Sequence, residues 1–229
     1  YAKSSNKTGV VIVTSGPGLT NLVTPILDSQ NDSTPLVVIS GQVPLSAMGT
    51  QAFQECPAID ITRSITKWSH CVQETDDLES IIEQAFYIAN DKKKGAVHID
   101  IPKCILAKKY IQQNNQQLNN LNKHQELSKN EKFHITGDFQ DQIDQVSSII
   151  NQAQKPIFYI GQGCNNASES LTKMVLKSNI PITTTIHAVG VFDENHPLSM
   201  EFLGMHGSAA ANYAIQQSDC IIAIGSRFD

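Results

Sequence analysis

The sequence predicts an α/β protein made of two doubly wound domains, each built around a mainly parallel sheet. Short continuous apolar runs recur along the chain, and such runs are typical of parallel strands buried on both faces. Amphipathic helical patterns lie between these runs, as expected where strand and helix alternate. The length of 229 residues exceeds that of an average single domain, so two modest domains are expected.

The first half opens with a strand, a glycine-rich turn and a helix. Residues 10–14 (VVIVT) are a β-branched run closed by SGPG, and residues 19–30 follow with helical spacing of apolar side chains. Three further elements are predicted here: a strand at residues 36–40, an amphipathic helix at residues 76–90 and a strand at residues 96–101. We expect the first domain to span residues 1–107.

The second half repeats the pattern. Its predicted strands are residues 156–160, 181–186 and 220–224, and its predicted helices are residues 142–152, 168–177 and 209–217. We expect this domain to span residues 137–229. Between the domains, residues 112–125 hold ten Asn or Gln among fourteen residues and cannot bury enough apolar surface to fold alone. Residues 108–136 are therefore predicted to be a linker.

Composition narrows the class of protein. A net charge of −5 supplies no basic surface, so neither nucleic acid nor an anionic membrane is expected as a partner. The five cysteines are widely spaced and never form a CxxC pair, which argues against a disulfide framework or a zinc site. No apolar run reaches the roughly 18 to 20 residues that span a bilayer. Because the chain starts without Met and stops directly after an apolar strand, we expect an internal fragment.

Two segments of the first domain could bind a ligand. The turn TSGPGLTN (residues 14–21) follows a predicted strand and would let backbone approach a ligand, although a purely structural turn is an open alternative. Residues 41–67 follow the next strand, at the strand end where ligands sit in open α/β sheets. That loop offers an amide, a carboxylate and an apolar side chain, and two cations suited to an anionic substrate: Gln54, Glu55, Phe53, Arg63 and Lys67. A solvated loop is the alternative.

The second domain carries glycine-bearing loops at predicted strand ends. Residues 161–166, 203–207 and 225–229 occupy the position where doubly wound folds bind dinucleotides. Arg227 offers a guanidinium for a diphosphate and Asp229 a carboxylate for a ribose hydroxyl. His98, alone within a buried strand, is expected to be a hydrogen-bonded core residue rather than a base. No nucleophile pairs with a histidine in a pattern that indicates Ser–His or Cys–His catalysis.

The segments GVVIVTSGPG, GQVP, GTQAFQE, TRSITKW and HIDIPK together resemble the acetolactate (acetohydroxyacid) synthases, a family of thiamine diphosphate-dependent enzymes. The resemblance continues in KPIFYIGQGC, IPITTTI, FLGMHG and ANYAIQQSDCIIAIGSRFD, and it leaves out only the Asn/Gln-rich segment. It implies a pyrimidine-binding domain truncated at its N-terminus, followed by a central Rossmann-like FAD-binding domain truncated at its C-terminus.

The resemblance implies a reaction and its partners. The catalytic subunit would decarboxylate pyruvate and join the product to a second 2-ketoacid, pyruvate or 2-ketobutyrate, giving 2-acetolactate or 2-aceto-2-hydroxybutyrate for valine and isoleucine biosynthesis. Thiamine diphosphate, FAD and Mg²⁺ would be the cofactors, with a homodimer or tetramer and a small regulatory subunit as assembly. The segments TKW and FDENHP favour a mitochondrial enzyme if the source is eukaryotic, with plastid stroma or bacterial cytoplasm as the alternatives.

The resemblance also assigns residues. Pro17 and Asn21 would flank the aminopyrimidine ring, Gln54 would reach cofactor and substrate, and Phe53, Pro44 and Lys103 would line the substrate channel, which makes Gln54, Lys103 and Phe53 the catalytic candidates. The FAD candidates are Lys93, Gly161, Gly163, Thr184, Leu203, Gly204, Met205, His206, Gly225, Arg227 and Asp229. Two positions depart from the family pattern: Lys93 replaces an arginine, and Gln162 interrupts a glycine triplet, so altered FAD binding is open.

Some of the family's machinery is not expected in this chain. The glutamate that activates the aminopyrimidine ring would lie upstream of Tyr1, and the magnesium ligands would lie in a third domain, so no metal ligand is expected here and the isolated chain is predicted to be inactive. Other thiamine diphosphate enzymes stay open as alternatives, namely pyruvate oxidase, glyoxylate carboligase and the ketoacid decarboxylases. A non-catalytic nucleotide-binding remnant is a further alternative.

Overall fold

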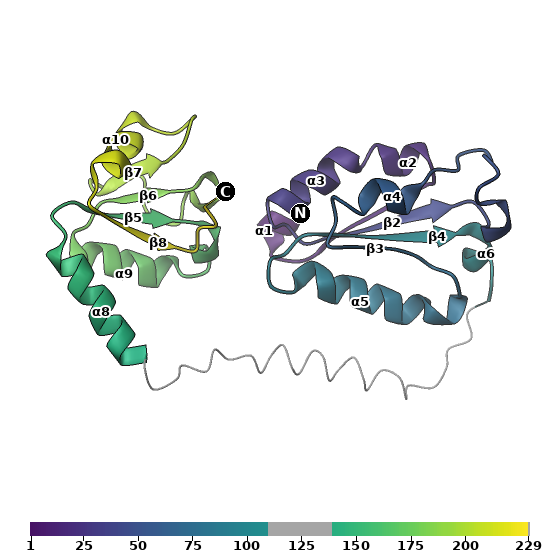
Figure 1. Cartoon of the computed structure of the whole chain (residues 1–229), viewed down its shortest axis with the longest axis horizontal. Coiled ribbons are helices and arrows are strands. Elements are labelled where there is room, and N and C mark those ends of the chain that lie inside the picture. The colour runs from purple at the N-terminus through teal and green to yellow at the C-terminus, as the bar shows by residue number, and fades with distance from the viewer. Residues whose placement is uncertain (110–138, 229) are drawn as a thin grey trace. The chain divides into compact units, whose positions relative to one another are not determined.

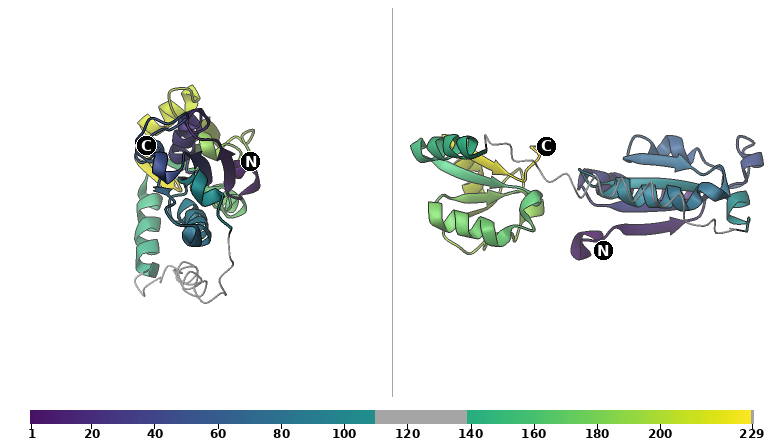
Figure 2. Two further views of the ribbon diagram at one scale, coloured as in Figure 1. Left: turned by 90° about the vertical axis from the view of Figure 1, so that its right-hand side faces the viewer. Right: turned by 90° about the horizontal axis from the view of Figure 1, so that it is seen from below.

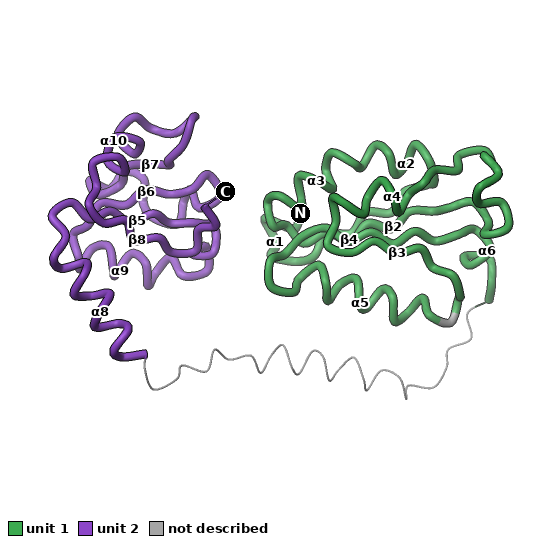
Figure 3. Tube along the Cα trace, in the orientation of Figure 1, with its two compact units in different colours: residues 1–132 green, residues 133–229 purple. Residues whose placement is uncertain are grey.

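A computed structural model describes residues 1–109 and 139–228, and all structural statements below concern these residues. The chain divides into two compact units, unit 1 at Tyr1–Lys132 and unit 2 at Phe133–Asp229 (Figure 3). Most of the segment predicted as a linker lies outside the described residues. Each unit is described by itself.

Unit 1 is built on a four-stranded parallel sheet with the order β1-β2-β4-β3. Its strands are β1 (Gly9–Val13), β2 (Leu36–Gln42), β3 (Trp68–Cys71) and β4 (Ala96–Pro102). The helices are α1 (Ala2–Ser5), α2 (Pro17–Thr20), α3 (Val23–Asn31), α4 (Ala58–Thr62), α5 (Leu78–Asn90) and α6 (Lys103–Leu106). Helices α2, α3 and α4 lie over one face of the sheet and α5 over the other (Figure 1). This arrangement confirms the doubly wound prediction for unit 1.

Central strand β4 shows why the apolar runs predicted the sheet. All seven of its residues are buried, as expected for a strand covered on both faces. Val97 and Ile99 join Ile81 and Ala85 of α5 in one core cluster. Edge strand β1 is different, because Val10 is 49% and Ile12 74% exposed; Figure 2 shows it at the margin of the unit.

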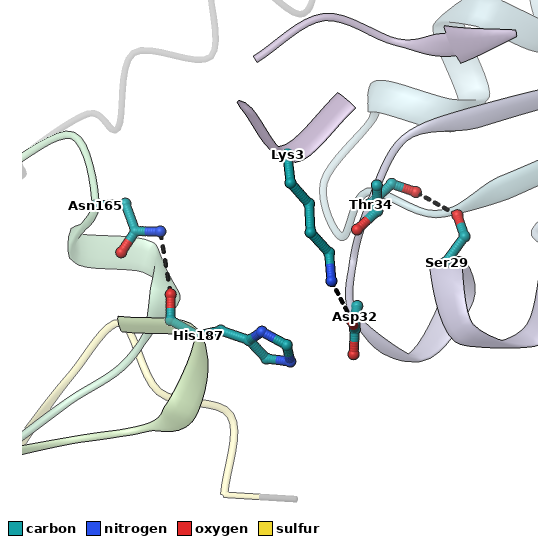
Figure 4. Close-up of polar contacts among 6 residues, drawn as sticks. All are labelled: Lys3, Ser29, Asp32, Thr34, Asn165 and His187. Atoms are coloured by element: carbon teal, nitrogen blue, oxygen red, sulfur yellow. Dashed lines mark hydrogen bonds and ion pairs between the residues drawn. The ribbon is translucent and has the colours of Figure 1, made fainter. Parts of the chain in front are cut away.

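The predicted helix at residues 19–30 is in fact two helices, α2 and α3. Pro25 has no N–H to donate to the carbonyl of Asn21, so a continuous hydrogen-bond ladder cannot pass this point. Around the break, the N–H of Leu22 instead donates to the Leu19 carbonyl at 2.8 Å. Nearby, Lys3 forms an ion pair with Asp32, and the Ser29 hydroxyl donates to the Thr34 carbonyl at 2.7 Å (Figure 4).

Unit 2 holds a second four-stranded parallel sheet, with the order β7-β6-β5-β8. Its strands are β5 (Pro156–Ile160), β6 (Ile182–Thr184), β7 (Ser199–Phe202) and β8 (Cys220–Ile224). Its helices are α8 (Phe139–Gln152), α9 (Ser168–Ser178) and α10 (Ala209–Gln217). Helices α8 and α9 lie on opposite sides of the sheet (Figure 2). The core clusters Phe158 and Ile160 of β5 with Leu171 and Val175 of α9.

One consequence for stability concerns Lys67, which the sequence assigned to an anionic substrate. That assignment is wrong, because the ammonium donates to the carbonyls of Ile88 and, at 2.6 Å, Asp91. These groups lie at the C-terminal end of α5, where a cation is favourable. Burial lowers the pKa of Lys67, and the negative charge of Asp91 partly offsets this.

We therefore expect Lys67→Met to lower the stability of unit 1 by about 1 to 2 kcal/mol, because two carbonyls lose a charged donor. Chemical denaturation would measure the change. Lys94→Met is the matched control, since Lys94 is exposed in the turn before β4. Equal effects of the two substitutions would contradict a capping role for Lys67.

Candidate functional site

The candidate residues of unit 1 gather at the carboxyl edge of its sheet. The strand register pairs Val13 with Ser40 and Ser40 with Asp100, so β1, β2 and β4 end side by side. The loops that follow these three strands carry, in turn, Pro17 and Asn21, then Pro44, Phe53 and Gln54, and finally Lys103. The parallel sheet therefore brings together residues that lie up to 86 positions apart.

The turn after β1 packs directly against the loop that carries Gln54. Gly16 has a φ of 59°, and a Cβ there would lie 2.8 Å from the carbonyl oxygen of Gln54. The backbone N–H of Gly16 also hydrogen-bonds Cys56, which opposes the rise that burial causes in the pKa of that thiol. Pro17 and Gln54 therefore belong to one surface, with Gln54 half-buried and Pro17 exposed.

Glu55 holds the Gln54 loop in shape. Its carboxylate accepts hydrogen bonds from the N–H of Gly49 and, at 3.0 Å, from the N–H of Ala52. Gly49, Gln51 and Gln54 all have positive φ, a conformation that needs such outside support in non-glycine residues. The loop presents Phe53 with 89% of its surface exposed. Glu55 is thus used by its own loop and is not a free carboxylate for a ligand.

This arrangement makes the loop sensitive to acid. Hydrogen bonds from backbone N–H groups, that of Gly49 above all, lower the pKa of Glu55. A carboxyl with a lowered folded-state pKa stabilises the fold above its ordinary pKa of about 4.3, and that contribution is lost as the pH falls further. We expect the protection factors of the amides in residues 49–55, which compare each exchange rate with its intrinsic rate at the same pH, to fall below this pH. Glu55→Gln should abolish this fall in protection, and an unchanged fall in this variant would refute the assignment.

The loop after β2 and the helix after β4 also meet. The N–H of Leu45 donates to the Cys104 sulfur at 3.5 Å, which places Pro44 near the start of α6. Lys103 is the first residue of α6 and is exposed. Lys93, by contrast, lies in the turn before β4, at the opposite edge of the sheet from the other unit 1 candidates. Arg63 pairs with Asp60 at 3.4 Å on the exposed surface of α4.

Five buried side chains form a core polar network beneath this edge: Ser40, Gln42, Thr62, His98 and Asp100. The Ser40 hydroxyl donates to Asp100 at 2.5 Å and lies 2.7 Å from His98 Nε2, while Thr62 Oγ1 lies 2.8 Å from His98 Nδ1. Both ring nitrogens are therefore partnered, which confirms His98 as a core residue.

The network contains a serine, a histidine and an aspartate but is not a hydrolytic triad. Because Ser40 donates its proton to Asp100, it accepts from His98 Nε2, so histidine does not act as a base toward it. Ser40 is 1% exposed and cannot reach a substrate. Burial lowers the pKa of His98 to about 4. Burial raises the pKa of Asp100, against the opposing hydrogen bonds of Ser40 and Gln42.

In unit 2 the glycines predicted to hold a dinucleotide pack against each other. A Cβ on Gly161 would overlap the carbonyl oxygen of Gly225 and the Cα of Ser226, and one on Gly163 would lie 2.9 Å from the Cα of Gly225. The N–H of Gly163 donates to the Gly225 carbonyl at 3.0 Å. The strand order changes direction between β5 and β8, so this contact lies at the topological switch point, the position at which doubly wound sheets bind ligands.

Two buried hydroxyls at the same edge have no hydrogen-bond partner in the described structure, Thr184 Oγ1 and Ser226 Oγ. Such groups are costly unless satisfied, and a bound polar ligand is one way to satisfy them. Thr184 ends β6, and its carbonyl accepts from the N–H of Leu203 at 2.9 Å, which draws the next loop to this edge. The donor set and the glycine contacts fit a dinucleotide.

The FLGMHG loop extends outward from the end of β7. Gly204 has a φ of 127° with open space around it, Met205 is 92% exposed and His206 is exposed. Asn212 of α10, which the sequence did not single out, holds this loop: its amide donates to the Gly204 carbonyl at 3.0 Å and accepts from the Gly204 N–H at 3.4 Å. An asparagine one helical turn past an N-cap was the available signal.

The remaining unit 2 candidates lie after β8. Arg227 is exposed at this edge, and Phe228 places its ring 5.8 Å from that of Tyr159. Asp229 lies outside the described residues. The Asn165 amide donates to the His187 carbonyl at 3.2 Å and ties the loop after β5 to the loop after β6 (Figure 4). Gln162, the departure from the glycine triplet, lies in a short 3₁₀ turn within the loop after β5.

Two negative findings apply to residues 1–109 and 139–228. No group of three or more His, Cys, Asp or Glu side chains could hold a metal ion there. In the same ranges, the helices are all too short or too polar to cross a bilayer.

Comparison with known proteins relates both units to one kind of enzyme. Residues 1–63 match the model "Thiamine pyrophosphate enzyme, N-terminal TPP binding domain", and residues 143–229 match "Thiamine pyrophosphate enzyme, central domain". The chain is 42% identical over its full length to the mitochondrial acetolactate synthase catalytic subunit of Saccharomyces cerevisiae. It is 40% identical to the chloroplastic acetolactate synthase of Arabidopsis thaliana and 39% to acetolactate synthase 1 of Zea mays. The chain spans 33 to 35% of the length of these relatives.

Proposed function

Because the chain belongs to the thiamine pyrophosphate enzymes, we propose that it is part of the catalytic subunit of an acetolactate synthase. This enzyme would decarboxylate pyruvate and join the resulting two-carbon unit to a second 2-ketoacid, pyruvate or 2-ketobutyrate. The products, 2-acetolactate and 2-aceto-2-hydroxybutyrate, lead to valine and isoleucine. The proposal depends most on the meeting of the Gly16 turn with the Gln54 loop at a strand end, in a chain about 40% identical to acetolactate synthases throughout.

The unit 1 edge would receive the thiamine ring and the ketoacid. Pro17 and Asn21 would flank the aminopyrimidine, and Gln54 would reach toward cofactor and substrate from the loop that Glu55 supports. Phe53 and Pro44 would supply apolar walls, and Lys103 would supply a positive charge for the ketoacid carboxylate. Thiamine diphosphate, when bound, supplies the carbon nucleophile that the side chains of this chain lack.

The unit 2 edge would hold FAD. Gly161, Gly163 and Gly225 would lie against the ligand, the Thr184 hydroxyl would hydrogen-bond it, and Arg227 would meet its diphosphate. Leu203, Gly204, Met205 and His206 would cover the ligand from the FLGMHG loop, with Asp229 as a further contact. Lys93, in unit 1, is an FAD candidate only by resemblance to the family. Lysine at position 93 keeps the charge of an arginine but lacks its bidentate fork, so weaker FAD binding is expected.

The same proposal implies a domain organisation, an oligomeric assembly and a cellular location. Residues 1–107 would be the pyrimidine-binding domain, residues 108–136 a linker and residues 137–229 the FAD-binding domain. Mg²⁺ and the diphosphate would be held by residues outside this chain. A homodimer or tetramer, with a small regulatory subunit, would complete the enzyme. The relatives are named as mitochondrial in yeast and chloroplastic in plants, and we propose a mitochondrial or plastid location for a eukaryotic source.

The test compares products. The complete catalytic subunit that contains this chain should form acetolactate from pyruvate. Acetyl phosphate would identify a pyruvate oxidase, free aldehyde a ketoacid decarboxylase, and tartronate semialdehyde from glyoxylate a carboligase of another class. Formation of any of these in place of acetolactate would overturn the proposal.

A flavin spectrum tests the unit 2 assignment separately. The purified subunit should show flavin absorbance, and Gly204→Val should reduce flavin retention, since a valine at a φ of 127° would change the backbone of the FLGMHG loop. Gly190→Val is the matched control, because Gly190 also has positive φ and open surroundings but lies in the loop after β6, outside the FLGMHG loop. Equal flavin loss in both variants would argue against an FAD role for the FLGMHG loop.

A further inference from the structure

The core polar network contains a carboxylate with an unusual environment. Asp100 is 1% exposed, and its partners in the described chain are two neutral donors, Ser40 Oγ at 2.5 Å and Gln42 Nε2 at 2.9 Å. Burying a carboxylate without a cation is costly, and a well-packed apolar residue would serve the core better. Packing alone therefore does not explain why an aspartate occupies position 100.

Gln42 connects Asp100 to the loop that carries Gln54. Its side-chain oxygen accepts from the N–H of Val43 at 2.9 Å, which fixes the orientation of the amide group. Its nitrogen then donates to Asp100 Oδ2 and, at 3.0 Å, to the carbonyl of Cys56. One amide thus joins the end of β2, the interior of β4 and the loop that follows Gln54.

Cys56 lies two residues after Gln54 and is the point where this loop is attached to the sheet. Its carbonyl also accepts from the N–H of Ala58 at 2.7 Å, but that bond is local to the loop. The Gly16 backbone, in turn, lies close to the backbone of Gln54, and its N–H lowers the pKa of the Cys56 thiol against the effect of burial. Fixing Cys56 therefore fixes the Gln54 loop and its contact with the turn before Pro17.

We propose that Asp100 is a positioning residue of the unit 1 edge, which sets the Gln54 loop through Gln42 and the Cys56 carbonyl. The inference rests on the proposed function for the claim that this loop serves catalysis. It assigns no contact between Asp100 and substrate or cofactor. Its consequence is that the loop's geometry depends on the direction of the hydrogen bond between residues 42 and 100.

A swap of the two groups tests this direction. Asp100→Asn alone leaves one acceptor oxygen at position 100 for two donors, Ser40 Oγ and Gln42 Nε2, and turns an amide donor toward one of them. We expect lower thermal stability and hydrogen exchange in residues 49–57 that is faster by about tenfold. The double variant, which combines Asp100→Asn with Gln42→Glu, restores the bond between the strands, because the new amide at position 100 can donate to the new carboxylate at position 42. It also sets a carboxylate against the Cys56 carbonyl, so the loop stays unattached.

The expected result is that the double variant of the 229-residue chain recovers melting temperature but not slow exchange in residues 49–57. Recovery of both would overturn the proposal and leave a purely structural role. Ile81→Val, a core change beneath α5, is the control for general destabilisation; if its melting temperature falls as far and its loop exchanges as fast as in Asp100→Asn, the proposal also fails.

A kinetic measurement separates this inference from the proposed function. In the complete subunit with saturating cofactors, the double variant should lose about tenfold in kcat/KM for pyruvate although it is stably folded. A stable double variant with unchanged kcat/KM would contradict the positioning role. If the unsubstituted subunit forms no acetolactate, the proposed function fails, and the exchange result still decides the coupling of Asp100 to the loop.

Discussion

Gly161→Ala is expected to destabilise unit 2 by about 3 kcal/mol, a large fraction of the roughly 5 to 15 kcal/mol by which a folded domain is stable. Gly161 has a φ of −104°, so alanine meets no backbone strain there. The added Cβ would instead overlap the backbone of Gly225 and Ser226, and backbone atoms between two strand ends cannot move aside as a flexible side chain can.

Hydrogen exchange would locate the effect. Amides of β5 and β8 should lose protection in Gly161→Ala while those of β2 and β4 keep it. Gly190→Ala is the matched control, because Gly190 has a φ of 88° and no atom near the added Cβ, so it carries only the conformational cost of about 1 to 2 kcal/mol. If Gly161→Ala destabilises unit 2 no more than this control, the close packing of the two loops is not as described.

A second large effect is acid sensitivity through His98. Burial lowers the pKa of His98 from 6.5 to about 4, whereas in the unfolded chain the imidazole keeps its ordinary value. Above pH 6.5 neither state binds the proton. As the pH falls from 6.5 toward 4, the unfolded state binds it alone, and the folded state loses about 3 kcal/mol of relative stability.

The measurement is the free energy of unfolding of unit 1 at pH 7.5 and pH 5.0, with the difference compared between the unsubstituted chain and His98→Gln. Because both proteins contain the other histidines, the comparison cancels their contribution to the pH dependence of stability. It also removes most of the contribution of Asp100, whose raised pKa acts in the opposite direction because the folded state takes up that proton first. A difference that is the same in both proteins would show that His98 does not titrate as its burial requires.

The central strands predicted from the sequence follow from burial, whereas β1 and β8 carry apolar runs although they are edge strands with exposed residues. Residues 36–40 and 96–101 read as continuous apolar runs because β2 and β4 lie in the middle of their sheet. The sequence analysis did not predict β3 and β7. Both are edge strands, and none of their residues is fully buried. An edge strand needs no apolar run, since it forms by pairing with a neighbour that is already in place.

The site candidates divide in a similar way. Loops that follow strands were predicted at the ligand-binding edge, and in each unit the structure brings most of them together. The partners of single side chains were not predicted. Glu55 and Lys67 read as groups offered to a ligand, but one supports its own loop and the other caps α5.

The sequence by itself determined the alternation of strand and helix, the two-unit organisation and the positions of the glycine turns, because apolar periodicity and backbone preferences are local properties. Only the tertiary structure decided which loops touch, that Gln42 links Asp100 to Cys56, and that Gly161 meets Gly225. Those contacts join residues 14 to 64 positions apart, and their geometry follows from strand register, which no local pattern encodes.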